Sequence, residues 1–295
     1  MSAPAPRAAE DARSFSFLVN PLSGGGAAPG AVVPVARLLR DAGASVEVTY
    51  SPGPRATLDL VRTAVGRGDV VVSVGGDGML SSIAGEVAAL GGTLGIVPAD
   101  VARVLLEAEP APVDLVDVEL PDGGSRVVAG SVYAGVDARA AEIVDRAHWL
   151  PRRLQYPFAA VRSLATFTPA TYSLVLDGTG HEVRAATVVV ANSGCYGSGM
   201  RIAPDASVTD GHLDVVVIGA AGRLDLIRSL PKVYDGSHVA LPEVRVLRAR
   251  HVELSVTDAP VGGIRMGAEG ERLPALVPGT RLSATVLPGA LNLLT

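Results

Sequence analysis

The first hundred residues alternate short valine-rich runs with longer amphipathic patterns, and this alternation constrains the fold more than any other feature. The pattern predicts strands over 14–20, 44–50, 69–74 and 92–98, and helices over 31–43, 55–68 and 79–90. Continuous apolar strands separated by helices of this length are typical of a parallel sheet covered on both faces. Ligands of such sheets bind at the carboxyl ends of the strands, where two glycine-rich loops fall, Asn20 to Gly26 and Gly75 to Gly78.

The pattern changes after about residue 112. Short strands broken by Asp-Gly and Gly-Gly turns dominate from there, with helical patterns only near 138–147, 157–168 and 223–230. Strands this frequent predict an antiparallel β-sandwich. We therefore expect a disordered leader over 1–13, a Rossmann-like α/β nucleotide-binding domain over 14–112 rejoined by 281–295, and a β-rich acceptor domain over 113–280.

Composition narrows the classes of function. The net charge of −5 gives no overall attraction to nucleic acid or anionic lipid, so any membrane contact would be local. Residues 146–157 mix arginines with aromatic side chains and can rest at a lipid headgroup surface, although an ordinary helix end fits as well. The sole cysteine, Cys195, excludes internal disulfides. Without a long apolar run or a secretory signal, we expect a soluble, cytoplasmic protein.

Both glycine-rich loops suit a phosphate ligand. Consecutive glycines expose backbone N–H groups, and a following helix adds its positive end. The first loop, "NPLSGGG", fits neither the P-loop pattern nor GxGxxG. In the second, Asp77 between glycines places a carboxylate beside nearly bare backbone, which suits Mg²⁺ or a ribose or phosphate network. A plain turn is the alternative for each loop.

The order and spacing of several motifs resemble the diacylglycerol kinase catalytic-domain family, which includes bacterial lipid kinases and sphingosine kinases and is distantly related to NAD kinases. "VNPLSGGG" resembles the first ATP loop of that family and "GGDGML" its Gly-Gly-Asp-Gly-Thr motif. "GTLGIVPA", "YAGVDARA" and "AEGE" resemble later family segments. The most specific likeness is "NSGCYGSGMRIAPDASVTDGHLDVVVI", from Asn192 to Ile218.

The resemblance implies an NAD kinase/diacylglycerol kinase-like fold and transfer of the γ-phosphoryl group of ATP, with Mg²⁺, to the hydroxyl of diacylglycerol or a related lipid alcohol. It implies Glu271 as the proton acceptor, Asp77 as a second catalytic residue, and Asp210 as the holder of a structural Mg²⁺ with carbonyls near Ser207 and His212. The nucleotide-binding residues that it implies are Asn20, Pro21, Ser23, Gly24, Gly25, Gly75, Gly76, Asp77, Gly78, Met79 and Asp100. A transient contact with a membrane surface follows from the lipid substrate.

Several positions depart from the family pattern. Met79 stands where the family has Thr, and Ser81 and Ser82 replace an Asn-Glu pair. Asp100 aligns only if four residues, Gly-Thr-x-Asn, are absent before it, which shortens a loop that contacts nucleotide and acceptor. Two alternatives therefore stay open: a degenerate member that binds nucleotide or lipid without turnover, and an NAD kinase-like enzyme. The sequence specifies neither the lipid nor the pathway, and an edge strand can form a homodimer.

Overall fold

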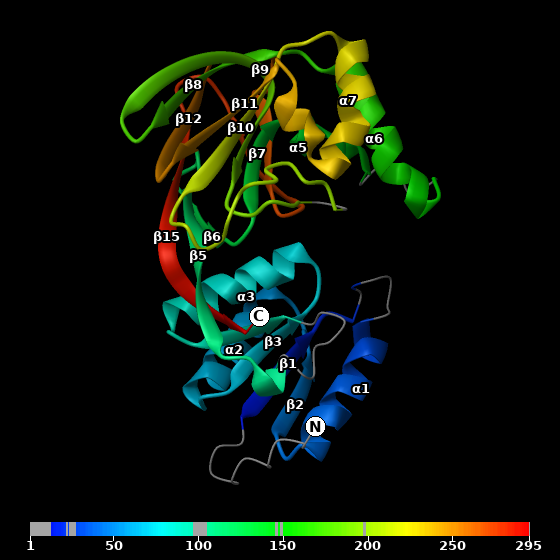
Figure 1. Ribbon diagram of the computed structural model, residues 1–295, viewed down its shortest axis with the longest axis vertical. Coiled ribbons are helices and arrows are strands. Elements are labelled where there is room, and N and C mark those ends of the chain that lie inside the picture. The colour runs from blue at the N-terminus through cyan, green and yellow to red at the C-terminus, as the bar shows by residue number, and fades with distance from the viewer. Residues whose placement is uncertain are drawn as a thin grey trace. The chain divides into compact units, whose positions relative to one another are not determined.

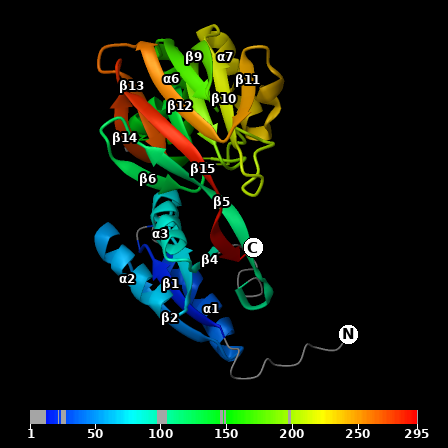
Figure 2. The same cartoon turned by 90° about the vertical axis from the view of Figure 1, so that its left-hand side faces the viewer.

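The computed structural model describes residues 13–21, 23, 28–96, 105–144, 147, 150–196 and 199–294. The chain forms two compact units (Figures 1 and 2). Unit 1 comprises Met1–Val113 with Gly289–Thr295, and unit 2 comprises Asp114–Pro288. The leader predicted over 1–13 lies outside the described residues except for Arg13. Among the helices of the described ranges, none has the length and apolar character needed to cross a membrane.

Unit 1 is the parallel α/β unit that the alternation predicts. Its elements are β1 (Ser14–Val19), α1 (Ala28–Asp41), β2 (Ser45–Tyr50), α2 (Pro54–Gly66), β3 (Val70–Val74), α3 (Asp77–Ala89) and β4 (Thr93–Ile96), completed by the end of β15 (Arg281–Leu294). The strands run in the order β15, β4, β3, β1, β2, and every neighbouring pair is parallel. The predicted fold of this region is confirmed.

Burial explains why these residues form these elements. β3 is buried along its whole length, as a strand covered on both faces must be. α1 buries Val32, Val35, Ala36 and Leu39, which recur at helical spacing, against the phenylalanines and valines of β1 and β3. Helix α1 lies on one face of the sheet, and α2 and α3 lie on the other (Figure 1).

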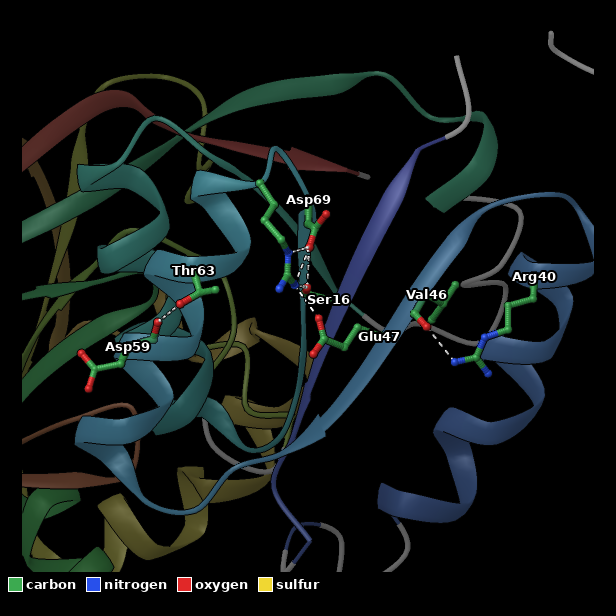
Figure 3. Close-up of polar contacts among 8 residues, drawn as sticks. Ser16, Arg40, Val46, Glu47, Asp59, Thr63 and Asp69 are labelled. Carbon is green, nitrogen blue, oxygen red and sulfur yellow. Dashed lines mark hydrogen bonds and ion pairs between the residues drawn. The ribbon is translucent and has the colours of Figure 1, made fainter. Parts of the chain in front are cut away.

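A polar network closes the amino edge of this sheet. The Ser16 hydroxyl donates to Asp69 Oδ2 at 2.7 Å, and the Arg67 guanidinium donates to Asp69 and to Glu47 (Figure 3). The hydrogen bond to Asp69 is the largest of the contacts that raise the pKa of Arg67. These contacts join β1, β2 and β3 near their starts. The glycine-rich loops lie at the opposite edge, where the strands end.

Over its described residues, unit 2 is an antiparallel β-sandwich with three α-helices. One sheet runs β14–β13–β7–β9–β10–β11, and the other runs β9–β8–β12–β15–β5–β6, with β9 contributing to both. The strands are β5 (Pro110–Glu119), β6 (Ser125–Val128), β7 (Ser131–Gly135), β8 (Ala170–Leu176), β9 (Thr179–Ala191), β10 (Leu213–Gly219), β11 (Val244–Ala249), β12 (His251–Asp258), β13 (Ile264–Ala268) and β14 (Glu271–Leu276). The helices are α5 (Val136–Val144), α6 (Arg152–Thr166) and α7 (Arg223–Asp235). The predicted sandwich is confirmed.

Both faces of β9 are covered in its second half. Val188 and Val190 point into the core between the two sheets, whereas Val189 and Ala191 pack in a second cluster with residues of α5 and α7. The helices lie together on one side of the unit (Figure 1). A strand covered on both sides needs a nearly continuous apolar run, which "AATVVVA" supplies with Thr187 as its polar residue.

Helices α3 and α7 differ from their predicted bounds. α3 begins at Asp77 rather than Met79, so the last two residues of the Gly-Gly-Asp-Gly corner form its first turn. α7 continues to Asp235, where Gly236 with φ of 83° ends it in the left-handed conformation.

Candidate functional site

The two glycine-rich loops of unit 1 begin side by side. β1 and β3 are parallel neighbours with Val19 opposite Val74. The Asn20 N–H donates to the Val74 carbonyl at 2.9 Å, so the first loop leaves the sheet next to the second. Ser23 N–H then donates to the Asn20 carbonyl at 3.1 Å and turns the chain, with Pro21 exposed between them. The structure therefore brings the described nucleotide-binding candidates of both loops to one edge.

Three of the predicted nucleotide-binding residues fall outside the part of the chain that the structure describes. Gly24, Gly25 and Asp100 lie outside the described residues, as does the shortened loop around Asp100. For Asp77 only the backbone is described.

The second corner has exposed backbone at its first two glycines. Gly75 and Gly76 are exposed, and a Cβ atom added at Gly76 would meet nothing within 4 Å. Gly76 is the N-cap residue of α3, and no side chain caps the helix. The first N–H groups of a helix have no partner within it, so an uncapped start is suited to bind a phosphate.

Met79 changes the surroundings of Gly75. Its sulfur lies 2.7 Å from where a Cβ at Gly75 would stand, so the thioether packs over this glycine. Ser82 Oγ donates to the Gly78 carbonyl at 2.9 Å and is thus bonded within its own helix. At the two positions, the family hydroxyl is replaced by an apolar group and the family carboxylate by a short hydroxyl.

Glu271 opens β14 in unit 2 and is paired with an arginine. Its Oε2 accepts from Arg126 Nη2 at 2.9 Å, and its side chain is half exposed. Glu269, with φ of 52°, accepts at Oε1 from the N–H groups of Ala129 (2.9 Å) and Gly130 (2.7 Å). Glu269 therefore anchors the turn that leads into Glu271.

Asp210 lies in a turn with hydrogen-bond donors around it. Oδ1 accepts from the His212 N–H at 3.0 Å, and Oδ2 accepts from Arg248 Nη2. His212 Nδ1 lies 2.7 Å from the Asp210 carbonyl oxygen, so the ring donates to it, and Ser207 shares a hydrogen bond with Thr209. Over the described ranges, Asp210 belongs to no group of three or more His, Cys, Asp or Glu side chains, so Arg248 and the His212 N–H are the groups found on its carboxylate. This arrangement does not fit the Mg²⁺ site that the resemblance implies for Asp210, Ser207 and His212.

One enclosed carboxylate was not predicted. Asp137, in the first turn of α5, accepts from the Thr187 hydroxyl at 2.8 Å and is hydrogen-bonded to Tyr196. Burial raises the pKa of Asp137, and the two hydrogen bonds oppose that shift. The sequence signal was present in "YAGVDARA", but nothing local marks this aspartate as enclosed.

A parallel α/β unit followed by an antiparallel β-sandwich is the fold of the NAD kinase and diacylglycerol kinase-like class. Residues 14–117 match the diacylglycerol kinase catalytic domain, and residues 130–295 match the YegS C-terminal NAD kinase beta sandwich-like domain. The chain belongs to the diacylglycerol kinase family, a family of lipid kinase enzymes.

Relatives agree with this assignment. A protein of Mycobacterium tuberculosis (strain H37Rv) named diacylglycerol kinase is 31% identical over 92% of this chain and 93% of its own length. The crystal structure of a diacylglycerol kinase from Bacillus anthracis str. Sterne superposes with a TM-score of 0.66 at 16% identity, covering 96% of this chain and 97% of the other. Yeast NADH kinase superposes with a TM-score of 0.51 at 11% identity, covering 99% and 87%. The two structures bear on the fold alone.

Proposed function

We propose that the chain transfers the γ-phosphoryl group of ATP to the hydroxyl of diacylglycerol or a related lipid alcohol. The observation that carries the proposal is the carboxyl edge of unit 1, where Asn20 is hydrogen-bonded to Val74 beside two exposed glycines and an uncapped helix. That combination is suited to a polyphosphate. The name of the mycobacterial relative supports a diacylglycerol acceptor.

The proposed reaction needs groups that bind phosphate and a group that accepts a proton. When bound, ATP with Mg²⁺ supplies the phosphoryl group and offsets its charge. The N–H groups at Gly76 and in the first turn of α3 hold phosphate oxygens. Glu271 takes the proton of the lipid hydroxyl as its oxygen bonds to the γ-phosphorus, while the bond to the β–γ bridging oxygen breaks and ADP leaves. Arg126 holds the Glu271 carboxylate in one orientation.

The test is the incorporation of labelled γ-phosphate into lipid vesicles containing diacylglycerol, sphingosine or monoacylglycerol. The wild-type chain should label at least one of these lipids. Glu271→Gln should reduce the rate by about a hundredfold or more, since general-base catalysis contributes on this scale. Glu182→Gln, an exposed glutamate on β9, is the matched control and should leave the rate unchanged. Failure to label any of the three lipids would reject the proposal.

The packing of Met79 over Gly75 favours a second candidate, a catalytically degenerate member that binds nucleotide or lipid without turnover. Calorimetry with ATP and Mg²⁺ separates the two, because binding without labelling supports the degenerate member. Met79→Thr should then increase ATP binding by giving the corner a hydroxyl.

The NAD kinase-like alternative is tested by adding NAD to the lipid assay. Labelling of NAD in place of lipid would support that alternative.

A further inference from the structure

Arg248 joins two acidic side chains of unit 2 that lie on different segments. Its position is set by the register of β10 and β11, in which Asp214 stands directly opposite Arg248. Arg248 Nε lies 3.5 Å from Asp214 Oδ1, and Nη2 donates to Asp210 Oδ2 in the turn just before β10. The Asp214 side chain is 8% exposed and that of Asp210 is 32% exposed, so both carboxylates are partly withdrawn from water.

Other polar groups of the same loop already have protein partners. The Val208 carbonyl accepts from the Asp114 N–H at 2.6 Å, and the Asp210 carbonyl accepts from the His212 ring. Buried Asp114 accepts at Oδ2 from the Gly211 N–H at 2.7 Å. A divalent cation at Asp210 would compete with these donors for the same oxygens and sit beside a guanidinium of like charge.

We propose that Arg248 is the built-in cation of the loop over residues 203–212, in place of the structural Mg²⁺ that the family resemblance implies. A guanidinium is always charged and presents several donors in a fixed plane, so it can bridge two carboxylates as a metal ion does. The loop then keeps its conformation without a divalent ion. This inference does not depend on the proposed kinase activity.

Thermal unfolding of the nucleotide-free protein tests the proposal, with EDTA or with millimolar Mg²⁺ at constant ionic strength. The wild-type midpoint should be the same in both. Arg248→Gln should lower the midpoint by about 2 to 4 °C in EDTA, and Mg²⁺ should recover part of that loss by entering the vacated position. The double variant Arg248→Gln with Asp210→Asn should lose the recovery, because the anionic ligand is gone.

Arg245→Gln is the matched control, since Arg245 is an exposed arginine on the same strand. It should match the wild type under both conditions. A wild-type midpoint that falls in EDTA and returns with Mg²⁺ would overturn the proposal. So would an Arg248→Gln variant as stable as Arg245→Gln, or one that Mg²⁺ does not stabilise. If Arg248→Gln does not fold, the Mg²⁺ content of the purified wild-type protein after dialysis tests the proposal instead. A stoichiometric amount of retained Mg²⁺ would overturn the proposal.

Discussion

At the scale of single residues, the ion pair between Arg126 and Glu271 matters for the proposed catalysis more than for stability. The Arg126 and Glu271 side chains are 30% and 50% exposed, and ion pairs in such positions add little to stability. Their consequence is orientation of the Glu271 carboxylate. We expect Arg126→Gln to lower kcat for lipid phosphorylation about ten- to hundredfold, because small displacements of a reacting group are costly. Steady-state kinetics on diacylglycerol vesicles measures this, with the KM for ATP unchanged.

The control for that variant is Arg281→Gln. Arg281 pairs with Glu253 at 3.3 Å, also as a partly exposed arginine–glutamate pair of unit 2. Its loss should leave kcat unaffected. Equal kcat values for the two variants would show that Arg126 does not position Glu271.

The buried carboxyl group of Asp137 should make the stability of the protein depend on pH. Burial raises its pKa above the ordinary value of 3.8, so the folded state binds this proton more tightly than the unfolded state. Between 3.8 and the folded pKa, rising pH therefore lowers the free energy of unfolding. Below 3.8, Asp137 is protonated in both the folded and the unfolded state, so its burial does not reduce the free energy of unfolding. Asp137→Asn removes the titration. Relative to wild type, the variant should gain stability as the pH rises from about 4 to about 7, as measured by urea unfolding.

Asp235→Asn gives a comparison of opposite sign. Hydrogen bonds from the Ser237 hydroxyl and N–H lower the pKa of Asp235, so its contribution is present above 3.8 and is lost as the pH falls. This variant should lose stability relative to wild type as the pH rises to about 4, and the difference should change little from there to about 7. Parallel pH profiles for the Asp137 variant and wild type would contradict the role of burial at Asp137.

At the scale of elements, the start of α3 can be tested without disturbing the fold. Gly76 has φ of −87° and ψ of 176°, which alanine adopts readily, and a Cβ there meets nothing within 4 Å. Gly76→Ala should therefore leave the unfolding midpoint unchanged. Its methyl group would stand beside the N–H groups of the first turn, and we expect about tenfold weaker ATP binding, roughly the loss of one hydrogen bond. Calorimetry measures the affinity.

Gly66→Ala at the end of α2 is the control, because its Cβ also meets nothing within 4 Å. It should bind ATP as the wild type does. Unchanged affinity in Gly76→Ala would argue against phosphate binding at this corner.

Elements whose signal is local could be predicted from the sequence. The valine-rich strands and amphipathic helices of unit 1 depend on short-range periodicity, and their predicted order matches the structure. Contacts between distant segments could not be predicted. Arg126 and Glu271 are 145 residues apart, and Arg248 meets Asp214 only through the register of two antiparallel strands. Hydrophobic patterns predict which residues form strands but not which strands are neighbours.

At the scale of the whole molecule, the end of the chain belongs to the core of unit 1. Residues 292–294 of β15 pair in parallel with Thr93, Leu94 and Gly95 of β4, after the same strand has paired with β12 in unit 2. Leu294 is 3% exposed and packs in the cluster that contains Phe15 and Phe17. The sequence indicated a returning C-terminal segment, but one continuous strand serving both units has no local signature.

Leu294→Ala tests whether the two units unfold separately. Removing a buried leucine side chain leaves a cavity, so we expect a loss of about 2 to 4 kcal/mol in the stability of unit 1. Hydrogen exchange should show faster amide exchange in β1, β3 and β4, with β8 and β12 unchanged, because these strands belong to the separate core of unit 2. Asn292→Ala, an exposed residue of the same strand, should leave both units as they are. Equal acceleration in β8 and β12 would show that the two cores unfold as one cooperative body.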